Sequence, residues 1–395
     1  MKLLYIHSAE KIKIDEYGNY YTDGSYNEEV WERYLRISKN LTVVFRIEKK
    51  VYDSNYAKCN FNSFNKDKIK LIEIEDLMYS IKNYINFLLR YRNKKTLKNA
   101  VINSDMIIVR LPCNEGNYAI KIAKKYNKKY IVEVVGCPFD TLWNHSIKGK
   151  LLAPIAYFNL RNSVKNAPYA MYVTNDYLQK KYPSNGKMVG CSDVVLENND
   201  NTVLEKRLNK IKCLRKNSVT ILCTVAAVNI KYKGQEHVIK AISYLNKKGY
   251  KYEYWLVGGG DNAYLKNKAK SYNVEDKVKF IGSVHHSAIY DILDSIDIYI
   301  QPSITEGLPR ALIEAMSRGC PCIGSNTGGI PELLSNYSVF KKGDLNDLIK
   351  IINIFDNKVL REEAKKNFYK SKEFYEPILN ERRNIFYDEI IKSQN

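Results

Sequence analysis

Two glutamates and the start of a helix form the stretch of the chain best suited to chemistry. Glu306 follows an apolar run from Ile298 to Ile300, and Glu314 comes eight positions later, inside a helix of about ten residues predicted to begin at Pro309. The first turn of a helix offers free backbone N–H groups and partial positive charge to an anion such as phosphate. A carboxylate accepts two hydrogen bonds from a vicinal diol. The pattern predicts a site for a nucleoside diphosphate sugar, and the alternative is a buried strand–helix unit with two solvated glutamates.

The elements that must position this site alternate between strand and helix. In the first half, apolar runs predict strands at 2–8, 41–47, 106–110, 131–135 and 171–174, with a long loop at 11–29 after the first. Glycines in that loop, Gly18 and Gly24, would let the backbone approach a ligand. In the second half, strands are predicted at 219–225, 252–257 and 277–281. Such alternation predicts an α/β fold with mostly parallel sheets, whose ligands bind beyond the carboxyl ends of the strands.

Length and composition indicate two domains. The chain has 395 residues, of which 45% are hydrophobic and 12% aromatic, which is enough for a large core. The sequence turns polar between Glu197 and Ser218, so we place the connection there and predict domains at 1–195 and 196–373. The first fifteen residues hold no signal-peptide core, and no apolar run reaches the ~18–20 residues of a spanning helix. A cytoplasmic location is expected.

Cysteines and histidines do not form a metal-binding pattern in the sequence. The eight cysteines are scattered, so they are read as small buried hydrophobes in a reducing compartment. Neither His-Glu-x-x-His nor Asp-x-Asp occurs. We therefore expect no metal and no cofactor.

The basic surplus indicates anionic partners. The formal net charge is +20, from 63 basic and 43 acidic residues. The segments 79–98 and 146–165 combine basic residues with apolar residues at helical spacing, among them Ile85, Leu88, Leu151 and Phe158. Such helices can lie on an anionic membrane, and the alternative is an ordinary surface helix. A nucleic-acid-binding protein is disfavoured because the aromatic residues fall within strand and helix patterns instead of an exposed basic surface.

Three segments carry a resemblance to a known family. They are VAAVNIKYKGQEHVIKAI (225–242), WLVGGGDNAYL (255–265) and the run from Val278 to Leu334 that contains Glu306 and Glu314. In this order and spacing they resemble the C-terminal domain of retaining glycosyltransferase family 4, over roughly 219–334. The resemblance implies the GT-B architecture: two Rossmann-like domains facing each other across a cleft, with the donor held mainly by the second.

The resemblance implies roles for individual residues on the donor side. Glu314 would hold the donor ribose, Glu306 the transferred sugar, and Lys233 the diphosphate. Backbone groups of Gly307, Leu308 and Pro309 would contact sugar and diphosphate, those near Ser283 and Val284 the nucleobase, and the turn at Gly258 would border the site. The family usually has a Gly-Arg pair about six residues before the lysine, and Ala226-Ala227 occupies those positions here. Lys231 is close enough in sequence to replace the missing arginine.

The acceptor side resembles the family only in outline. Asp140 and His145, after the strand at 131–135, are candidates there together with Gly18 and Gly24. A capping aspartate and a surface histidine are the alternatives. The tail from 374 to 395 resembles a final helix that packs back on the first domain.

The resemblance implies a reaction as well. It is metal-independent transfer of a hexosyl unit, with retention, to a glycan or lipid-linked saccharide, in surface polysaccharide synthesis. An inactive sugar-nucleotide-binding protein of the same fold is the alternative, motivated by Ala227.

Overall fold

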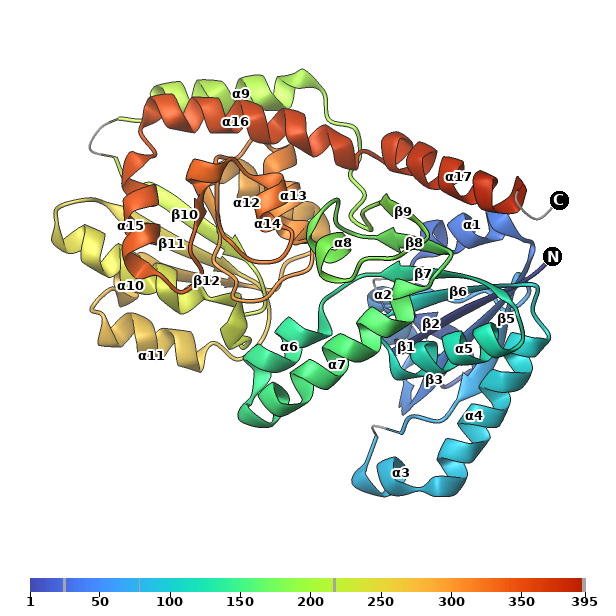
Figure 1. Cartoon of the computed structure of the whole chain (residues 1–395). Coiled ribbons are helices and arrows are strands. Elements are labelled where there is room, and N and C mark those ends of the chain that lie inside the picture. Colours follow the sequence, from blue (N-terminus) through green and yellow to red (C-terminus); the bar gives the residue numbers. More distant parts are fainter. Residues whose placement is uncertain (24–25, 78, 216–217, 393–395) are drawn as a thin grey trace.

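Two mainly parallel sheets with helices on both faces make up the chain (Figure 1). The computed structural model describes residues 1–23, 26–77, 79–215 and 218–392. Gly24 lies outside the described residues. The first sheet contains nine described strands, in the order β4-β2-β1-β6-β7-β8-β9, with β3 paired to both β1 and β5. The second contains six described strands, in the order β12-β11-β10-β13-β14-β15. The sequence prediction of an α/β fold with parallel sheets is confirmed.

The first half consists of nine strands and eight α-helices within the described residues. The strands are β1 (Lys2–Asp15), β2 (Tyr20–Thr22), β3 (Asn40–Tyr52), β4 (Asn62–Ser63), β5 (Ile69–Ile74), β6 (Met106–Leu111), β7 (Lys129–Val134), β8 (Tyr169–Tyr172) and β9 (Lys187–Gly190). The helices are α1 (Glu28–Ile37), α2 (Ser54–Asn60), α3 (Ile81–Ile85), α4 (Phe87–Ile102), α5 (Asn114–Lys125), α6 (Pro138–His145), α7 (Ile147–Lys165) and α8 (Tyr177–Lys181).

The second half begins with a helix. Its strands are β10 (Thr220–Val225), β11 (Tyr252–Val257), β12 (Val278–Gly282), β13 (Ile298–Gln301), β14 (Cys322–Ser325) and β15 (Val339–Phe340). Its α-helices are α9 (Asn201–Cys213), α10 (Gln235–Lys247), α11 (Ala263–Ser271), α12 (His286–Ser295), α13 (Arg310–Ser317), α14 (Ile330–Leu333), α15 (Leu345–Ile354), α16 (Asn357–Ser371) and α17 (Glu376–Lys392). The short 3-10 turns are η1 (Lys231–Lys233), η2 (Glu275–Lys277), η3 (Asn336–Ser338) and η4 (Lys372–Phe374).

The first strand is longer than the sequence indicates. The first apolar run ends at Ile6, but β1 continues to Asp15 because its second part pairs with β3 from Lys11 opposite Arg46 to Asp15 opposite Tyr52. The register shifts between Ile6 and Lys11, which lets the alternating segment 11–15, with Ile12 in the core, extend the sheet. The predicted long loop is therefore partly strand.

Two segments have a local structure that the sequence did not indicate. The polar stretch expected to connect the domains is mostly the helix α9, whose Arg207 is buried and donates to the carbonyls of Ile296 and Leu293, both at 2.6 Å. The segment 79–98 is two helices instead of one, because Asn86 ends α3 and caps α4 by accepting a hydrogen bond from the Leu89 N–H at 3.2 Å.

The last helix returns to the first sheet. Tyr387 of α17 donates a hydrogen bond to Glu133 of β7 at 3.1 Å, and Arg383 donates to the carbonyl oxygen of Ser192 at 3.1 Å. Figure 1 shows α17 beside α1 and β9, while α16 stays with the second half. The two halves are thus joined twice, once through the chain before α9 and once through α16 and α17.

Candidate functional site

The carboxyl ends of the second sheet bring the predicted donor residues to one edge. Strands β10 to β15 pair in parallel, so the loops that follow them share that edge. Lys233 follows β10, Gly258 follows β11, Ser283 follows β12 and Glu306 follows β13. Residues far apart in sequence therefore become neighbours.

Glu306 and Lys233 form an ion pair at the centre of this edge. The Lys233 Nζ lies 2.8 Å from Glu306 Oε1. Two more groups donate to the same oxygen: Ser303 Oγ at 2.8 Å and Gln301 Nε2 at 3.1 Å. The carboxylate is thus oriented from three sides, and the lysine is a fixed cation next to it.

Backbone contacts explain why Lys233 reaches Glu306. Gly234 has φ +76°, and a Cβ there would lie 2.0 Å from the carbonyl oxygen of Pro302. Only glycine accommodates both the left-handed conformation and this close approach. The N–H of Ile304 also donates to the Tyr232 carbonyl at 2.8 Å, so η1 is attached directly to the loop that carries Glu306.

A pair of glycines supports the other side of the Glu306 loop. The Gly329 N–H donates to the Gly307 carbonyl at 2.7 Å. Gly328 has φ +58°, and a Cβ there would lie 2.3 Å from the Glu306 carbonyl oxygen. Leu308 is half-buried and packs against the core clusters of both halves. The loop is therefore held by its own sheet and by the opposite half.

Glu314 lies deeper, on α13. It is 3% exposed, and its Oε1 is 2.9 Å from Nε2 of His286, the first residue of α12. The helix begins at Arg310, with Pro309 as its N-cap residue, and has eight residues instead of about ten. The free N–H groups of its first turn come directly after Leu308. An anion bound to them would contact a part of the chain that lies between Glu306 and Glu314 in sequence.

The turn at Gly258 brings the ends of three strands together. Gly258 has φ +148°, and a Cβ would lie 2.2 Å from the Ala226 carbonyl oxygen, while its N–H donates to the Gly282 carbonyl at 2.9 Å. Ser283, directly after β12, is exposed, and Val284 is half-buried against the core. Gly258 and Gly259 are half-buried, and Gly260 is exposed.

Lys231 points elsewhere in this structure. Its Nζ lies 4.6 Å from the centre of the Tyr264 ring, a cation–π contact. Ala227, in place of the family's arginine, has no cationic group. Lys233 is therefore the cation that contacts Glu306 among the residues the structure describes.

The first half meets this edge through α6. Thr305 Oγ1 lies 2.7 Å from Asn144 Nδ2 and 3.3 Å from the carbonyl oxygen of Asp140. The Asp140 carboxylate accepts from Lys181 Nζ at 2.8 Å and from Tyr177. Burial alone would raise the pKa of Asp140, but the hydrogen bonds from Lys181 and Tyr177 outweigh it and lower the pKa. Asp140 thus anchors the helix that touches the Glu306 loop.

The other acceptor-side candidates lie apart from this contact. His145 is exposed at the end of α6. Gly18 is exposed in the turn between β1 and β2, where its φ of +78° serves the turn and its N–H donates to the Asp15 carbonyl at 3.0 Å. Both remain predictions for acceptor binding.

A cavity of about 610 Å³ lies between the two halves. The second half contributes His285, His286 and Arg310, and the first contributes Arg33, Arg110 and Asp193 among others. Arg110 pairs with Asp193. His286 lines this cavity and contacts Glu314, so one side chain separates the deeper glutamate from a space that is large enough for a small ligand.

Comparisons with known proteins agree with this geometry. The family model for glycosyl transferases group 1 matches residues 206–371. Protein CapJ of Staphylococcus aureus is 36% identical over 367 residues, covering 89% of this chain and 86% of CapJ. The chain belongs to the glycosyl transferases group 1 family. It is a glycosyltransferase of family 4, and the family implies a nucleotide-sugar donor.

Other similarities fit this assignment. The amylovoran biosynthesis glycosyltransferase AmsK of Erwinia amylovora is 39% identical over 111 residues, covering 26% of this chain and 27% of AmsK. The solved structure of Anabaena Alr3699/HepE in complex with UDP has a TM-score of 0.62 at 15% identity and covers 100% of both chains. The GT-B fold implied by the resemblance is therefore confirmed.

Several residues of this glycosyltransferase were not predicted to belong to the site. Gln301 and Ser303 orient Glu306, His286 contacts Glu314, and Gly328 supports the Glu306 loop. Ser303 and Gln301 precede Glu306 by three and five positions, so their proximity could have been noticed. His286 could not, because α12 and α13 meet only in three dimensions.

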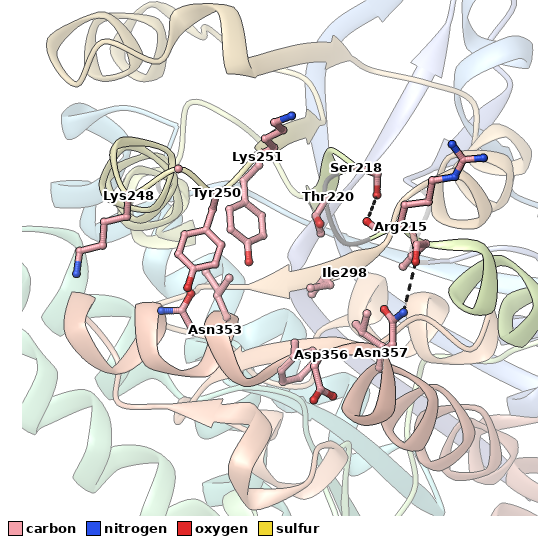
Figure 2. Close-up of a pocket in the computed structure, with 16 residues that line it drawn as sticks. Arg215, Ser218, Thr220, Lys248, Tyr250, Lys251, Ile298, Asn353, Asp356 and Asn357 are labelled. Atoms are coloured by element: carbon pink, nitrogen blue, oxygen red, sulfur yellow. Dashed lines mark hydrogen bonds between the residues drawn. The ribbon is translucent and has the colours of Figure 1, made fainter.

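The pocket drawn in Figure 2 is at the opposite edge of the second sheet. It has a volume of about 620 Å³ and is lined by residues such as Arg215, Thr220, Lys251 and Asn357. Thr220 and Tyr252 are the first residues of β10 and β11. Because the predicted donor residues follow the last residues of these strands, the pocket in Figure 2 is separate from them.

Neither a metal cluster nor a spanning helix is found in the described parts of the chain. No group of three or more His, Cys, Asp or Glu residues within 1–23, 26–77, 79–215 and 218–392 could hold a metal ion. Over the same residues, none of the helices has the length and apolar character needed to cross a bilayer.

Proposed function

We propose that this glycosyltransferase moves a hexosyl unit from a nucleoside diphosphate sugar to a glycan or lipid-linked saccharide, with retention and without a metal ion. The observation that carries the proposal is the Glu306–Lys233 pair, 2.8 Å apart and beside the start of α13. A departing diphosphate needs positive charge that is already in place. Lys233 and the N–H groups of the first turn of α13 would supply it.

The two glutamates have different roles in this proposal. Glu314, buried and held by His286, binds the ribose diol, which replaces His286 as its partner. Glu306 binds hydroxyls of the transferred sugar, with Gly307 and Leu308 offering N–H groups. Backbone groups at Ser283 and Val284, beside the Gly258 turn, bind the nucleobase.

The first half binds the acceptor in this proposal. Residues 1–195 form the acceptor half, which contacts the donor edge through α6. Residues 196–373 form the donor half, and α17 packs back on the acceptor half. Asp140 acts by positioning α6, and His145, Gly18 and Gly24 are carried forward as acceptor-side predictions. Surface polysaccharide is the proposed product class, since AmsK is named for amylovoran biosynthesis. The enzyme would work in the cytoplasm, peripheral to the inner face of the membrane.

A screen of nucleotide sugars by thermal shift tests the donor proposal. A ligand that binds only the folded chain raises its melting temperature. We expect one nucleotide sugar to stabilise the wild-type chain and to have little effect on Glu314→Ala. Absence of stabilisation by every nucleotide sugar, or equal stabilisation of both proteins, would contradict the proposal.

A binding protein without transferase activity is the second candidate. It is favoured by Ala227 in the position of the family's arginine and by the Lys231–Tyr264 contact, which directs the nearest alternative cation elsewhere. Hydrolysis of a nucleotide sugar that binds separates the two candidates. Slow release of nucleoside diphosphate supports the transferase, and binding without any turnover supports the second candidate.

A further inference from the structure

The helices of the first half expose large apolar side chains in two places. On α7, Ile147, Leu151, Ile155 and Phe158 are each more than half exposed. Their spacing of four, four and three residues places them along one side of the helix. We call these four residues the α7 apolar face. A contiguous apolar face of this kind on a folded surface indicates an interaction.

A second group lies at the end of α3 and the start of α4. Ile85, Phe87, Leu88 and Tyr91 are each more than half exposed, and we call them the α4 apolar group. Helices α4 and α7 both contact α5, so the three helices form one layer over the first sheet. Figure 1 shows α3, α4, α6 and α7 along the lower edge of the molecule. The helices that carry the two groups therefore lie along the same edge of the molecule (Figure 1).

Both segments are basic and contain no acidic residue. Between residues 79 and 98 there are six basic residues, and between 146 and 165 there are four, with no Asp or Glu in either. Lys150 lies 5.8 Å from the ring centre of Trp143, which is itself 43% exposed. Aromatic rings and lysines next to an apolar face are typical of helices at a lipid headgroup layer.

We propose that the α7 apolar face and the α4 apolar group dock the chain on an anionic bilayer. Lipid acyl chains would cover the apolar side chains, and the flanking lysines and arginines would contact acidic headgroups. A second copy of this chain is a poorer occupant, because it would place two acid-free basic surfaces against each other. The charge pattern thus selects the lipid surface.

This docking would also position the acceptor. Helix α6 directly precedes α7, and its Asn144 lies 2.7 Å from Thr305, the neighbour of Glu306. A saccharide attached to a membrane lipid would be presented beside the loop that holds the transferred sugar. This step rests on the proposed function, whereas the docking itself does not.

Cosedimentation of the full chain with vesicles tests the docking. We expect binding to vesicles that contain phosphatidylglycerol and much weaker binding to vesicles of phosphatidylcholine alone. The double variant Leu151→Gln/Ile155→Gln should bind at least about tenfold more weakly, because each side chain loses its transfer into an apolar phase. Lys148→Gln should bind roughly fivefold more weakly, from about 1 kcal/mol per cation.

Ile385→Gln is the matched control. Ile385 is 56% exposed and Ile155 58% exposed, but Ile385 belongs to α17. Its substitution should leave vesicle binding unchanged. In a separate measurement on the wild-type chain, the fluorescence emission of Trp143 should shift to the blue when the chain binds vesicles. The proposal is overturned by no binding to either vesicle, by equal weakening in Ile385→Gln, or by a self-association without vesicles that the double variant abolishes.

Donor binding is measured on the same variants, so the two proposals can fail separately. Vesicle binding without stabilisation by any nucleotide sugar would keep the docking and reject the proposed function. Stabilisation by a nucleotide sugar without vesicle binding would keep the donor proposal and reject the docking.

Discussion

Removing the charge of Lys233 is the most informative perturbation of the site. In Lys233→Met the aliphatic stem remains, but Glu306 loses its contact at 2.8 Å and keeps Ser303 and Gln301 as its donors among the described residues. The Lys233 and Glu306 side chains are 22% and 11% exposed. We expect a stability loss of about 1–2 kcal/mol, less than the ~3–5 kcal/mol of a fully buried pair. Loss of a fixed cation at the leaving group should lower kcat about 10²–10³-fold.

A double-mutant cycle separates the structural from the chemical role of the pair. Glu306→Gln alone should also lower stability and activity. In Lys233→Met/Glu306→Gln the unpaired charge is gone, so the free energy of unfolding should partly recover. Activity should not recover, because the diphosphate and the sugar have both lost their partners.

Urea unfolding and initial rates with the donor found by thermal shift measure the two quantities. Lys233→Leu is a second variant in case the methionine packs poorly. Turnover of the single variants within about tenfold of wild type would refute the reasoning. Recovery of turnover in the double variant, in parallel with its stability, would also refute it, since the pair would then be purely structural.

Three further outcomes are expected. Gly328→Ala should lose about 1–3 kcal/mol of unfolding free energy in urea and most of its activity, because the new Cβ would lie 2.3 Å from the Glu306 carbonyl oxygen. The control is Gly343→Ala, which is also at positive φ but has no atom within 4 Å of its Cβ and should keep its activity. Equal loss of activity in both variants would argue against a site effect. Burial lowers the pKa of His7 from 6.5 to about 3, so between these values the unfolded chain binds a proton that the folded chain does not. Stability should therefore decrease as the pH is lowered from 6.5 toward 3, by up to about 1.4 kcal/mol per pH unit. His7→Gln should flatten this slope, and an unchanged slope would reject His7 as its source. Glu314→Ala should remove most donor affinity and activity in calorimetry and rate measurements, and unchanged values of both would contradict its assignment.

The second half of the fold was largely predictable from the sequence. Its strands are short and apolar, and several of them end at glycine-containing turns, so β11 was predicted with the observed bounds, 252–257. The sequence is less informative for the first half. The extension of β1 to Asp15 depends on pairing with β3, and such long-range pairing overrides the local polar character of Lys11 and Lys13.

The candidate site was predictable where residues share a loop and less so where they meet across loops. Glu306 and Gly307 are adjacent in sequence, and their neighbourhood follows from the chain itself. The contact between Glu314 and His286 spans 28 positions and depends on how α12 packs beside α13. The direction of Lys231 toward Tyr264 depends likewise on the packing of α11.

A crystal structure of the chain with a bound nucleoside diphosphate would test the central claim most directly. We predict that both ribose hydroxyls lie within hydrogen-bond distance of Glu314, with His286 displaced from its 2.9 Å contact, and that the diphosphate lies between Lys233 and the first turn of α13. A nucleotide bound away from Glu314, for example in the pocket of Figure 2 beside Arg215 and Lys251, would contradict the account.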